Sequence, residues 1–193
     1  MTPTQERQLQ DLVDRQEIWS LLLRYGRGLD RRDWALVRGC YWDDAIDDHH
    51  SFVGTPDEFV RWAFAGFKAG YHVQHHGLNN HLLELQGDNA HSETYYTFIA
   101  YNHEAPHLFS IGRYIDHFQR RSGVWKIADR ITVIEKCYGL VDHPLDAMSR
   151  AGDTSYGPLP PSVPDRTDVS YIRPLPVRRP KQDGEWSAPG EWG

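Results

Sequence analysis

The sequence contains little cysteine and no long apolar run. Cys40 and Cys137 are the only cysteines in 193 residues and lie far apart, so we expect no disulfide framework and a reducing compartment. No stretch approaches the roughly 20 apolar residues that span a bilayer. The N-terminal sequence MTPTQERQLQDLVDRQ is polar and lacks the apolar core of a secretory signal. These absences predict a cytoplasmic protein without a membrane span.

The chain also lacks an excess of positive charge. It carries 21 Lys and Arg against 27 Asp and Glu, which gives a formal net charge of -6 at pH 7. Binding to nucleic acid requires a concentrated basic face, and the Lys and Arg residues here are scattered among acids. We therefore expect a small molecule rather than nucleic acid as the partner. The length fits one domain with a proper core.

The first 70 residues carry the signals of three helices. Thr2 and Gln5 stand where a capping box places them, and apolar residues follow at helical spacing. Asp30 and Asp33 end this first helix, and the sequence WALVRGCYW predicts a short second one. A second capping box, TPDE from Thr55, predicts the third helix. Between the second and third helices, DDAIDDHHSFVG has the length of one strand.

After residue 70 the sequence changes to strand patterns. Four segments are rich in aromatic and β-branched residues: HVQHHGLNNHLLELQ, AHSETYYTFIAYN, LFSIGRYIDHFQR and VWKIADRITVIEKC. Turn signals separate them, so they predict an antiparallel meander. Helices followed by such a meander predict an α+β domain, in which N-terminal helices pack on a curved, mostly antiparallel sheet.

The C-terminal part of the chain differs from the rest. We expect residues 1–143 to form the domain and residues 144–193 to form a proline-rich extended arm, because most of the 12 prolines lie after His143. A disordered tail is the alternative. Tyr171, Ile172, Trp186 and Trp192 would anchor an arm that lies over the domain or over a neighbouring subunit.

Four motifs resemble the SnoaL-like branch of the nuclear transport factor 2 superfamily: LLRYGRGLDRRDW, YWDDA, HHGLNN and GRYIDHFQRRSGVWKIADR. The resemblance covers roughly residues 8 to 140, and the enzymes that the chain resembles are γ-hexachlorocyclohexane dehydrochlorinase and, behind it, bile acid dehydratase and scytalone dehydratase. It implies a cone-shaped α+β barrel and a lyase that works without a cofactor.

The resemblance also implies which residues perform the chemistry. In these enzymes an Asp at the end of the first helix orients a His on the strand that opens the meander, and the His removes a proton from carbon. Carried over by position, these residues are Asp30 and His75, and an arginine that assists the leaving group becomes Arg130. Tyr25 stands where the dehydrochlorinase has a lysine. Without the resemblance, a helix cap is the favoured role of Asp30.

Strand alternation assigns the faces around His75. In a regular strand His75, Gly77 and Asn79 share one face, and His76 points to the other. We therefore expect His75 and Asn79 to face the pocket, with Asn79 as a neutral donor and acceptor for a substrate oxygen. A bulge at Gly77 would put Asn80 in its place.

The other candidates for substrate contact are mostly aromatic, as suits a flat or polycyclic substrate. They are Tyr41, Trp42, Asp47, Tyr96 and Tyr114. For any single aromatic residue, a place in the core is the plainer interpretation. A metal site is a weaker alternative for the sequence DDHH with His72 and His75, because no HxH, HExxH or CxxC spacing supports it.

Two functions of different classes follow from these features. The first is a cofactor-independent lyase, a dehydratase or a related elimination that includes loss of formaldehyde, with a His-Asp dyad as the base. The alternative is a ligand-binding or assembly module of the same fold, since fold does not determine function. In either case we expect a homo-oligomer, a dimer or trimer, because an open sheet with an apolar outer face needs cover.

Overall fold

The computed structural model describes residues 1–142 and 163–174. Residues 143–162 and 175–193, which include most of the expected arm with Trp186 and Trp192, lie outside the described residues. Among those that are described, no helix has the length and apolar character needed to cross a membrane.

Three helices precede most of the sheet: α1 at Pro3–Asp30, α2 at Trp34–Gly39 and α3 at Pro56–Gly70. Both predicted capping boxes are confirmed, at Thr2 with Gln5 and at Thr55 with Glu58. The side chain of Asp33 caps α2 by accepting the N–H of Leu36. The second helix is shorter than predicted, because the chain enters a strand directly after Cys40.

Six strands form one mixed sheet. They are β1 at Tyr41–Asp48, β2 at Val53–Gly54, β3 at Tyr71–Gln86, β4 at Asn89–Asn102, β5 at His107–Arg121 and β6 at Val124–Leu140. The order is β2-β1-β6-β5-β4-β3, and only the pair β1 and β6 is parallel. The predicted four-strand meander is therefore confirmed. The segment predicted as a single strand before α3 instead contributes to two strands, β1 beside β6 and the short β2 beside β1.

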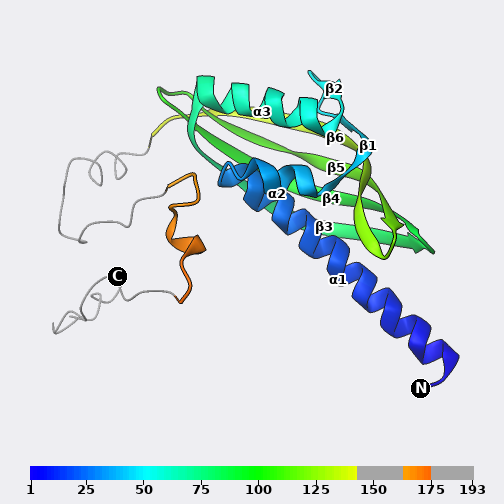
Figure 1. The fold of residues 1–193 in the computed structure, drawn as a ribbon. Helices are drawn as coiled ribbons and strands as arrows, with labels where there is room; N and C mark the ends of the chain where they lie inside the picture. Colours follow the sequence, from blue (N-terminus) through cyan, green and yellow to red (C-terminus); the bar gives the residue numbers. More distant parts are fainter. Residues whose placement is uncertain (143–162, 175–193) are drawn as a thin grey trace, which may run out of the picture.

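The helices cover one face of the curved sheet (Figure 1). The sheet is open rather than closed into a barrel, because β2 and β3 form its two edges. α1 packs against β3 and β6, and α3 packs against β1 and β3. The core between these layers contains Ile18, Leu22, Phe118 and Ile127, all with no exposed area. This is the cone-shaped α+β arrangement expected from the resemblance.

A short part of the C-terminal sequence packs on the end of α1. The ring of Tyr171, in the 3-10 helix Val169–Tyr171, lies 4.3 Å from the guanidinium carbon of Arg27. Asp168 pairs with Arg31 at 3.5 Å, and Arg166 donates to Asp33. Residues 163–174 therefore contact both sides of the turn between α1 and α2.

Candidate active site

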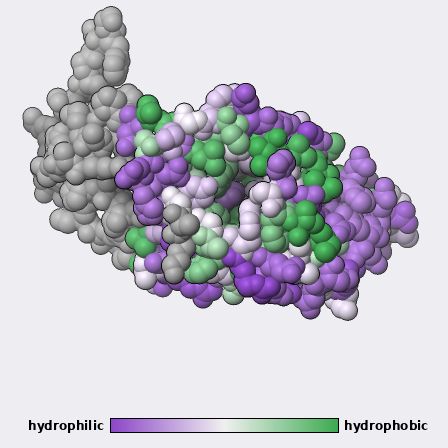
Figure 2. Space-filling view, turned by 90° about the horizontal axis from the view of Figure 1, so that it is seen from above, coloured by the Kyte–Doolittle hydropathy of each residue, from purple (hydrophilic) through white to green (hydrophobic). Residues whose placement is uncertain are grey.

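A cavity of about 360 Å³ lies between α3 and strands β3 to β6. Its walls are mainly aromatic and carry a few polar groups. The lining residues include Phe59, Trp62, Phe67, Tyr71, Phe98, Tyr96, Tyr114, His49, His76, Ser51, Ser110 and Thr132. Figure 2, which looks down on the side of α3, shows a hollow near the centre of that face with hydrophobic residues on both sides of it. Such a cavity suits a small, largely apolar and flat ligand.

One wall of the cavity carries a carboxylate and imidazole pair. Asp30 is the last residue of α1, and its Oδ1 lies 2.6 Å from Nδ1 of His76 on β3. Because a carboxylate only accepts, Nδ1 carries a proton, and in the neutral ring the lone pair then lies on Nε2. The backbone N–H of His76 also donates to this carboxylate. The ring packs on Phe98 at 4.7 Å between centroids, which fixes its orientation.

The structure contradicts the prediction that His75 meets Asp30. His75 is exposed and points to the opposite face of β3. The face that carries His76 is the one that α1 covers, because Gln74 on that face is buried and donates to the carbonyl oxygen of Leu29 at 2.6 Å. The predicted alternation of side chains along β3 was right. Both faces of this strand carry polar residues, however, and the prediction assigned the wrong face to the cavity.

The prediction for Asn79 is also wrong. The ladder between β3 and β4 is interrupted between Leu78 and His81, and both Asn79 and Asn80 are exposed. The irregularity lies just after Gly77, close to where the sequence suggested a bulge, but it turns neither amide into the cavity.

A second carboxylate and imidazole pair lies at another part of the cavity, where only its histidine, His49, lines the wall. Asp47 on β1 is fully buried, accepts the hydroxyl of Tyr41 at 2.5 Å and contacts Nδ1 of His49. Burial and the charge of Asp47 raise the pKa of Tyr41 well above its ordinary value. The sequence analysis named Asp47 and Tyr41 as substrate contacts and considered His49 only within the DDHH metal alternative. In the structure His49 lines the cavity, whereas Asp47 and Tyr41 are fully buried and are not among its lining residues.

Arg130 lies in the core rather than on the cavity wall. It is 1% exposed and makes two hydrogen bonds to Asp116, at 2.6 and 2.8 Å. Its guanidinium stacks between the rings of Tyr25 and Tyr114, at 4.1 and 4.2 Å. Burial alone would lower the pKa of Arg130, but Asp116 raises it well above the ordinary value.

Of these three stacked groups, Tyr114 lines the cavity, whereas Tyr25 and Arg130 do not. Burial raises the pKa of Tyr25 far above its ordinary value, so its phenol is neutral. Tyr96 lines the cavity as well, and its ring stacks on Tyr114 at 4.7 Å. The structure therefore brings Tyr96 and Tyr114 to the cavity and places Tyr25 and Arg130 in the second layer.

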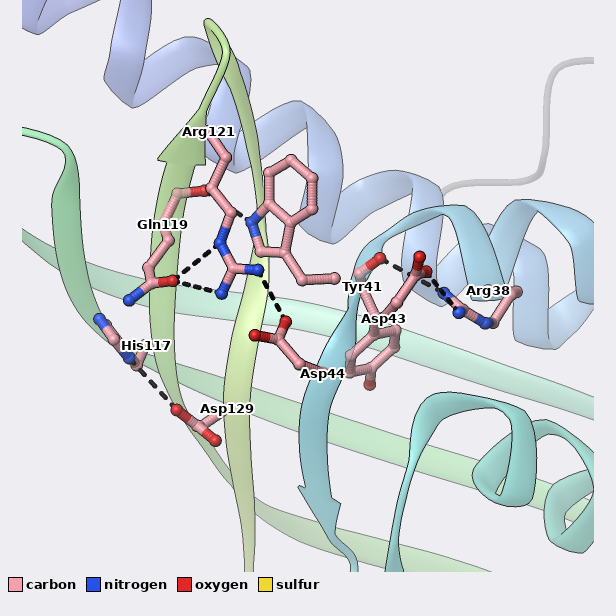
Figure 3. Close-up of polar contacts among 9 residues, drawn as sticks. Arg38, Tyr41, Asp43, Asp44, His117, Gln119, Arg121 and Asp129 are labelled. Carbon is pink, nitrogen blue, oxygen red and sulfur yellow. Dashed lines mark hydrogen bonds and ion pairs between the residues drawn. The ribbon is translucent and has the colours of Figure 1, made fainter.

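Trp42 is directed away from the cavity, contrary to its predicted place in the pocket. Its indole N–H donates to the carbonyl oxygen of Gln119 at 2.9 Å, and Arg121 and Lys126 cover its ring. Figure 3 shows the neighbouring contacts of Arg121 with Asp44 and with the side chain of Gln119. Because β1 alternates, Trp42 points to the opposite side from Tyr41.

The metal interpretation gains no support from the positions of these side chains. Within residues 1–142 and 163–174, no three His, Cys, Asp or Glu side chains are grouped so that they could hold a metal ion. Since His50 and His75 are exposed while His49 lines the cavity, the residues of the proposed metal set do not meet at one point.

Residues 10–131 match the model of a family described as the SnoaL-like domain. A comparison with curated protein sequences gave no match. Among solved structures, the chain is similar to hexachlorocyclohexane dehydrochlorinase (LinA) type 2, with 21% identity and a TM-score of 0.66 over 70% of this chain and 95% of that one. It is also similar to the LinA-type3 dehydrochlorinase of Novosphingobium barchaimii LL02, with 20% identity and a TM-score of 0.65 over 70% and 96%.

A third similar structure comes from Novosphingobium aromaticivorans DSM 12444, and its name gives scytalone dehydratase as a provisional assignment. The identity is 18% and the TM-score 0.62, over 69% of this chain and 91% of that one. At these identities the likeness shows a common fold.

Proposed function

Because the chain belongs to the SnoaL-like family, we propose that it is a cofactor-independent lyase that eliminates water, or a related group such as formaldehyde, from a small hydroxylated aromatic or polycyclic compound. The observation that carries this proposal is the 2.6 Å contact between Asp30 and His76 at the wall of an aromatic cavity. The neighbours named as dehydrochlorinases and as a dehydratase support a lyase or a related isomerase. Breakdown of aromatic compounds is the metabolic setting that fits this substrate class.

The pair has the geometry of a general base. Nε2 of His76 takes a proton from a substrate carbon, and Asp30 holds the ring by Nδ1 and stabilises the imidazolium that forms. The side chains of His76 and Asp30 are 7% and 13% exposed, so bulk water screens their interaction little. Loss of the leaving group then forms the double bond.

The cavity also offers a polar group for a substrate oxygen. The hydroxyl of Thr132 lines the cavity, is buried and has no hydrogen-bond partner among the described residues. A buried hydroxyl without a partner costs free energy, and a ligand oxygen in the cavity would satisfy it. The aromatic walls would hold the flat part of the same ligand by stacking.

The test combines a substrate screen with two matched variants. Hydroxylated aromatic and steroid compounds are screened for new conjugated absorbance, and the turnover of each hit is measured for His76→Ala and His75→Ala. We expect His76→Ala to lower turnover by roughly 10²–10⁴, the usual size of a general-base contribution. His75→Ala is the control. His75 lies on the same strand but faces away from the cavity, so the turnover of this variant should stay near that of the unchanged protein.

Two results would contradict the proposal. An unchanged rate in His76→Ala would remove this residue from the mechanism. Binding of screened compounds without any turnover, measured as a thermal shift, would favour the alternative of a ligand-binding module.

The proposal includes assembly as a dimer or trimer. The outer face of the sheet carries exposed apolar residues on neighbouring strands, namely Tyr95, Ile115 and Ile131, and Ile115 lies directly opposite Ile131. A second copy of the chain would cover them. Sedimentation at micromolar concentration should give a multiple of 22.4 kDa, and a monomer would refute the assembly.

A further inference from the structure

Two histidines that lie far apart in the sequence line the same cavity, and each is held by its own carboxylate. His76 on β3 pairs with Asp30, and His49, directly after β1, pairs with Asp47. In both pairs Nδ1 faces the carboxylate and carries a proton, because the carboxylate only accepts. Nε2 is therefore the nitrogen of each ring that remains for a ligand.

The ring of His49 is held in place by packing and by its backbone. It stacks on Phe59 with 4.7 Å between centroids and lies 6.0 Å from Trp62 and 6.4 Å from Tyr114. Its backbone N–H donates to the carbonyl oxygen of Phe52. The side chain is 15% exposed. A ring fixed in this way has the preorganisation that a proton-transfer group needs.

The surroundings of Asp47 favour a charged His49. Asp47 has no exposed area, and its other partner, the phenol of Tyr41, is neutral. The buried cation of this region, Arg130 on β6, already binds Asp116 through two hydrogen bonds. Helix α3 presents the uncharged rings of Phe59 and Trp62 to His49, and β5 presents the phenol of Tyr114. With a neutral His49, the buried carboxylate of Asp47 would have hydrogen bonds only from neutral groups, and a buried charge without a paired opposite charge is costly.

The surroundings of Asp30 differ, and they leave His76 free to be neutral. The carboxylate of Asp30 is 13% exposed, whereas that of Asp47 has no exposed area. It also accepts the backbone N–H of His76, which stabilises its charge without an imidazolium. The two pairs therefore suit opposite tasks, since a neutral imidazole accepts a proton and an imidazolium donates one.

We propose that His49 is the general acid of this cavity, and that its Nε2–H protonates the leaving hydroxyl oxygen of the substrate. This assignment rests on the proposed function and adds a role for a second imidazole. In one turnover the C–H proton passes to Nε2 of His76, its electron pair forms the C=C bond, and the C–O bond breaks. The departing oxygen takes the proton of His49 and leaves as water. Afterwards His76 is charged and His49 neutral, and solvent returns one proton from the first to the second.

This role predicts a preference among substrates. Hydroxide is a poor leaving group and needs a proton in the transition state, whereas acetate leaves without one. A cavity with a general acid should therefore act on β-hydroxy carbonyl compounds next to an aromatic ring. The acid should matter little for the corresponding acetates.

The first test reads the charge of each histidine without any substrate. Nitrogen-15 NMR spectra of the labelled full chain are recorded at neutral pH, and each ring is assigned by the signal lost in His49→Gln or in His76→Gln. We expect both ring nitrogens of His49 to be protonated, and His76 to be neutral with the proton on Nδ1. Asp47→Asn should convert His49 to the neutral form, and the exposed His50→Gln should change neither ring. A neutral His49 at neutral pH would overturn the proposal, even if Asp47→Asn fails to fold.

The second test uses two probes that differ in the leaving group: the aldol of acetone with para-nitrobenzaldehyde, and its acetate ester. In His49→Gln we expect elimination of water to fall roughly 10²-fold or more, with acetate elimination much less affected. His76→Gln should slow both probes equally. Equal losses on both probes in His49→Gln would overturn the acid role. If the unchanged protein turns over neither probe, the proposed lyase activity fails for this class, and the NMR result still decides the charge of His49.

Discussion

Oδ1 of Asp30 lies 2.6 Å from Nδ1 of His76, although 46 positions separate the two residues in the sequence. The same carboxylate accepts the backbone N–H of His76, so it fixes both the strand and the ring. The end of α1 and the start of the meander are thereby joined at the wall of the cavity.

Replacing the carboxylate of this pair tests whether its charge matters. In Asp30→Asn the amide NH₂ can donate to Nδ1, which favours the tautomer with the proton on Nε2 and removes the base. We expect turnover to fall by roughly 10²–10⁴ while the circular dichroism spectrum stays unchanged. Asp43→Asn is the control, because the side chain of Asp43 is 93% exposed and pairs with Arg38, away from the cavity. A wild-type rate in Asp30→Asn would exclude the charge from the mechanism.

The buried pair of Arg130 and Asp116 should dominate the stability of the core. Arg130→Met leaves Asp116, which is 1% exposed, as an unpaired buried charge, and this costs about 3–5 kcal/mol in comparable cases. The double variant Arg130→Met, Asp116→Leu should regain part of that loss, because no charge is left unpaired. The measurement is the free energy of unfolding in urea.

Arg113→Met is the control for this series. Like Arg130, Arg113 makes hydrogen bonds to carboxylates, in this case those of Glu93 and Glu135. Unlike Arg130, it lies on the outer face of the sheet. Because water solvates the carboxylates that it leaves behind, we expect a much smaller loss. A loss equal to that of Arg130→Met would contradict the argument from burial.

Gly112 sets the position of an aromatic wall of the cavity. A Cβ at this position would meet the carbonyl oxygen of Val133 and the hydroxyl of Tyr96 well inside contact distance. Gly112→Ala should therefore destabilise the protein by about 1–3 kcal/mol and displace Tyr96. At Gly66, in α3, an added Cβ would meet no atom within 4 Å. Gly66→Ala should therefore raise the free energy of unfolding by about 0.5–1 kcal/mol. Urea unfolding of both variants checks the opposite signs, and a neutral Gly112→Ala would contradict the close approach.

Asp33 should make stability depend on pH in the acid range. Partial burial would raise the pKa of Asp33, but hydrogen bonds from Arg166 and from the N–H of Leu36 outweigh burial and lower it. The unfolded chain therefore binds the proton more readily, and the stabilisation is present above the unfolded pKa of about 3.9. It is lost as the pH falls through the lower folded pKa.

We expect Arg166→Ala to reduce the fall in unfolding free energy between about pH 5 and pH 3, because Asp33 then has a smaller pKa difference between the two states. Arg173→Ala is the control, since Arg173 is exposed and its hydrogen bond within the described part of the chain goes to the neighbouring carbonyl oxygen of Ile172. An unchanged pH dependence in Arg166→Ala would refute the role of this ion pair.

Truncation before Gly152 tests the C-terminal arm. The docked residues 163–174 hold Arg27 and Arg31, which flank Asp30 along the chain. We expect the truncated protein to remain folded but to be slower or less selective, because the end of α1 loses these contacts. Activity on the native substrate, together with circular dichroism, provides the measurement. A full rate after truncation would limit the arm to packing or assembly.

The sequence by itself determined the elements of this fold and their order. The capping boxes at Thr2 and Thr55 and the period-two pattern after residue 70 are local signals, and local hydrogen bonding and sterics set their outcome. Alternation within β3 was equally local, so the sequence correctly separated His75 from His76. Asp30 could be named because the motif around it resembles a known family.

Tertiary structure alone decided which face of each strand meets the cavity. Both faces of YHVQHHGLNNH are polar, so only the position of α1, which covers Gln74, shows that His76 points inward. The same holds for Trp42, which lies under Arg121 rather than in the pocket. It also holds for His49, because its proposed role as an acid depends on the burial of Asp47. Likewise, the ion pair with Asp116 on the neighbouring strand holds the side chain of Arg130 in the core. Burial and pairing depend on residues far apart in the chain, and no local pattern encodes them.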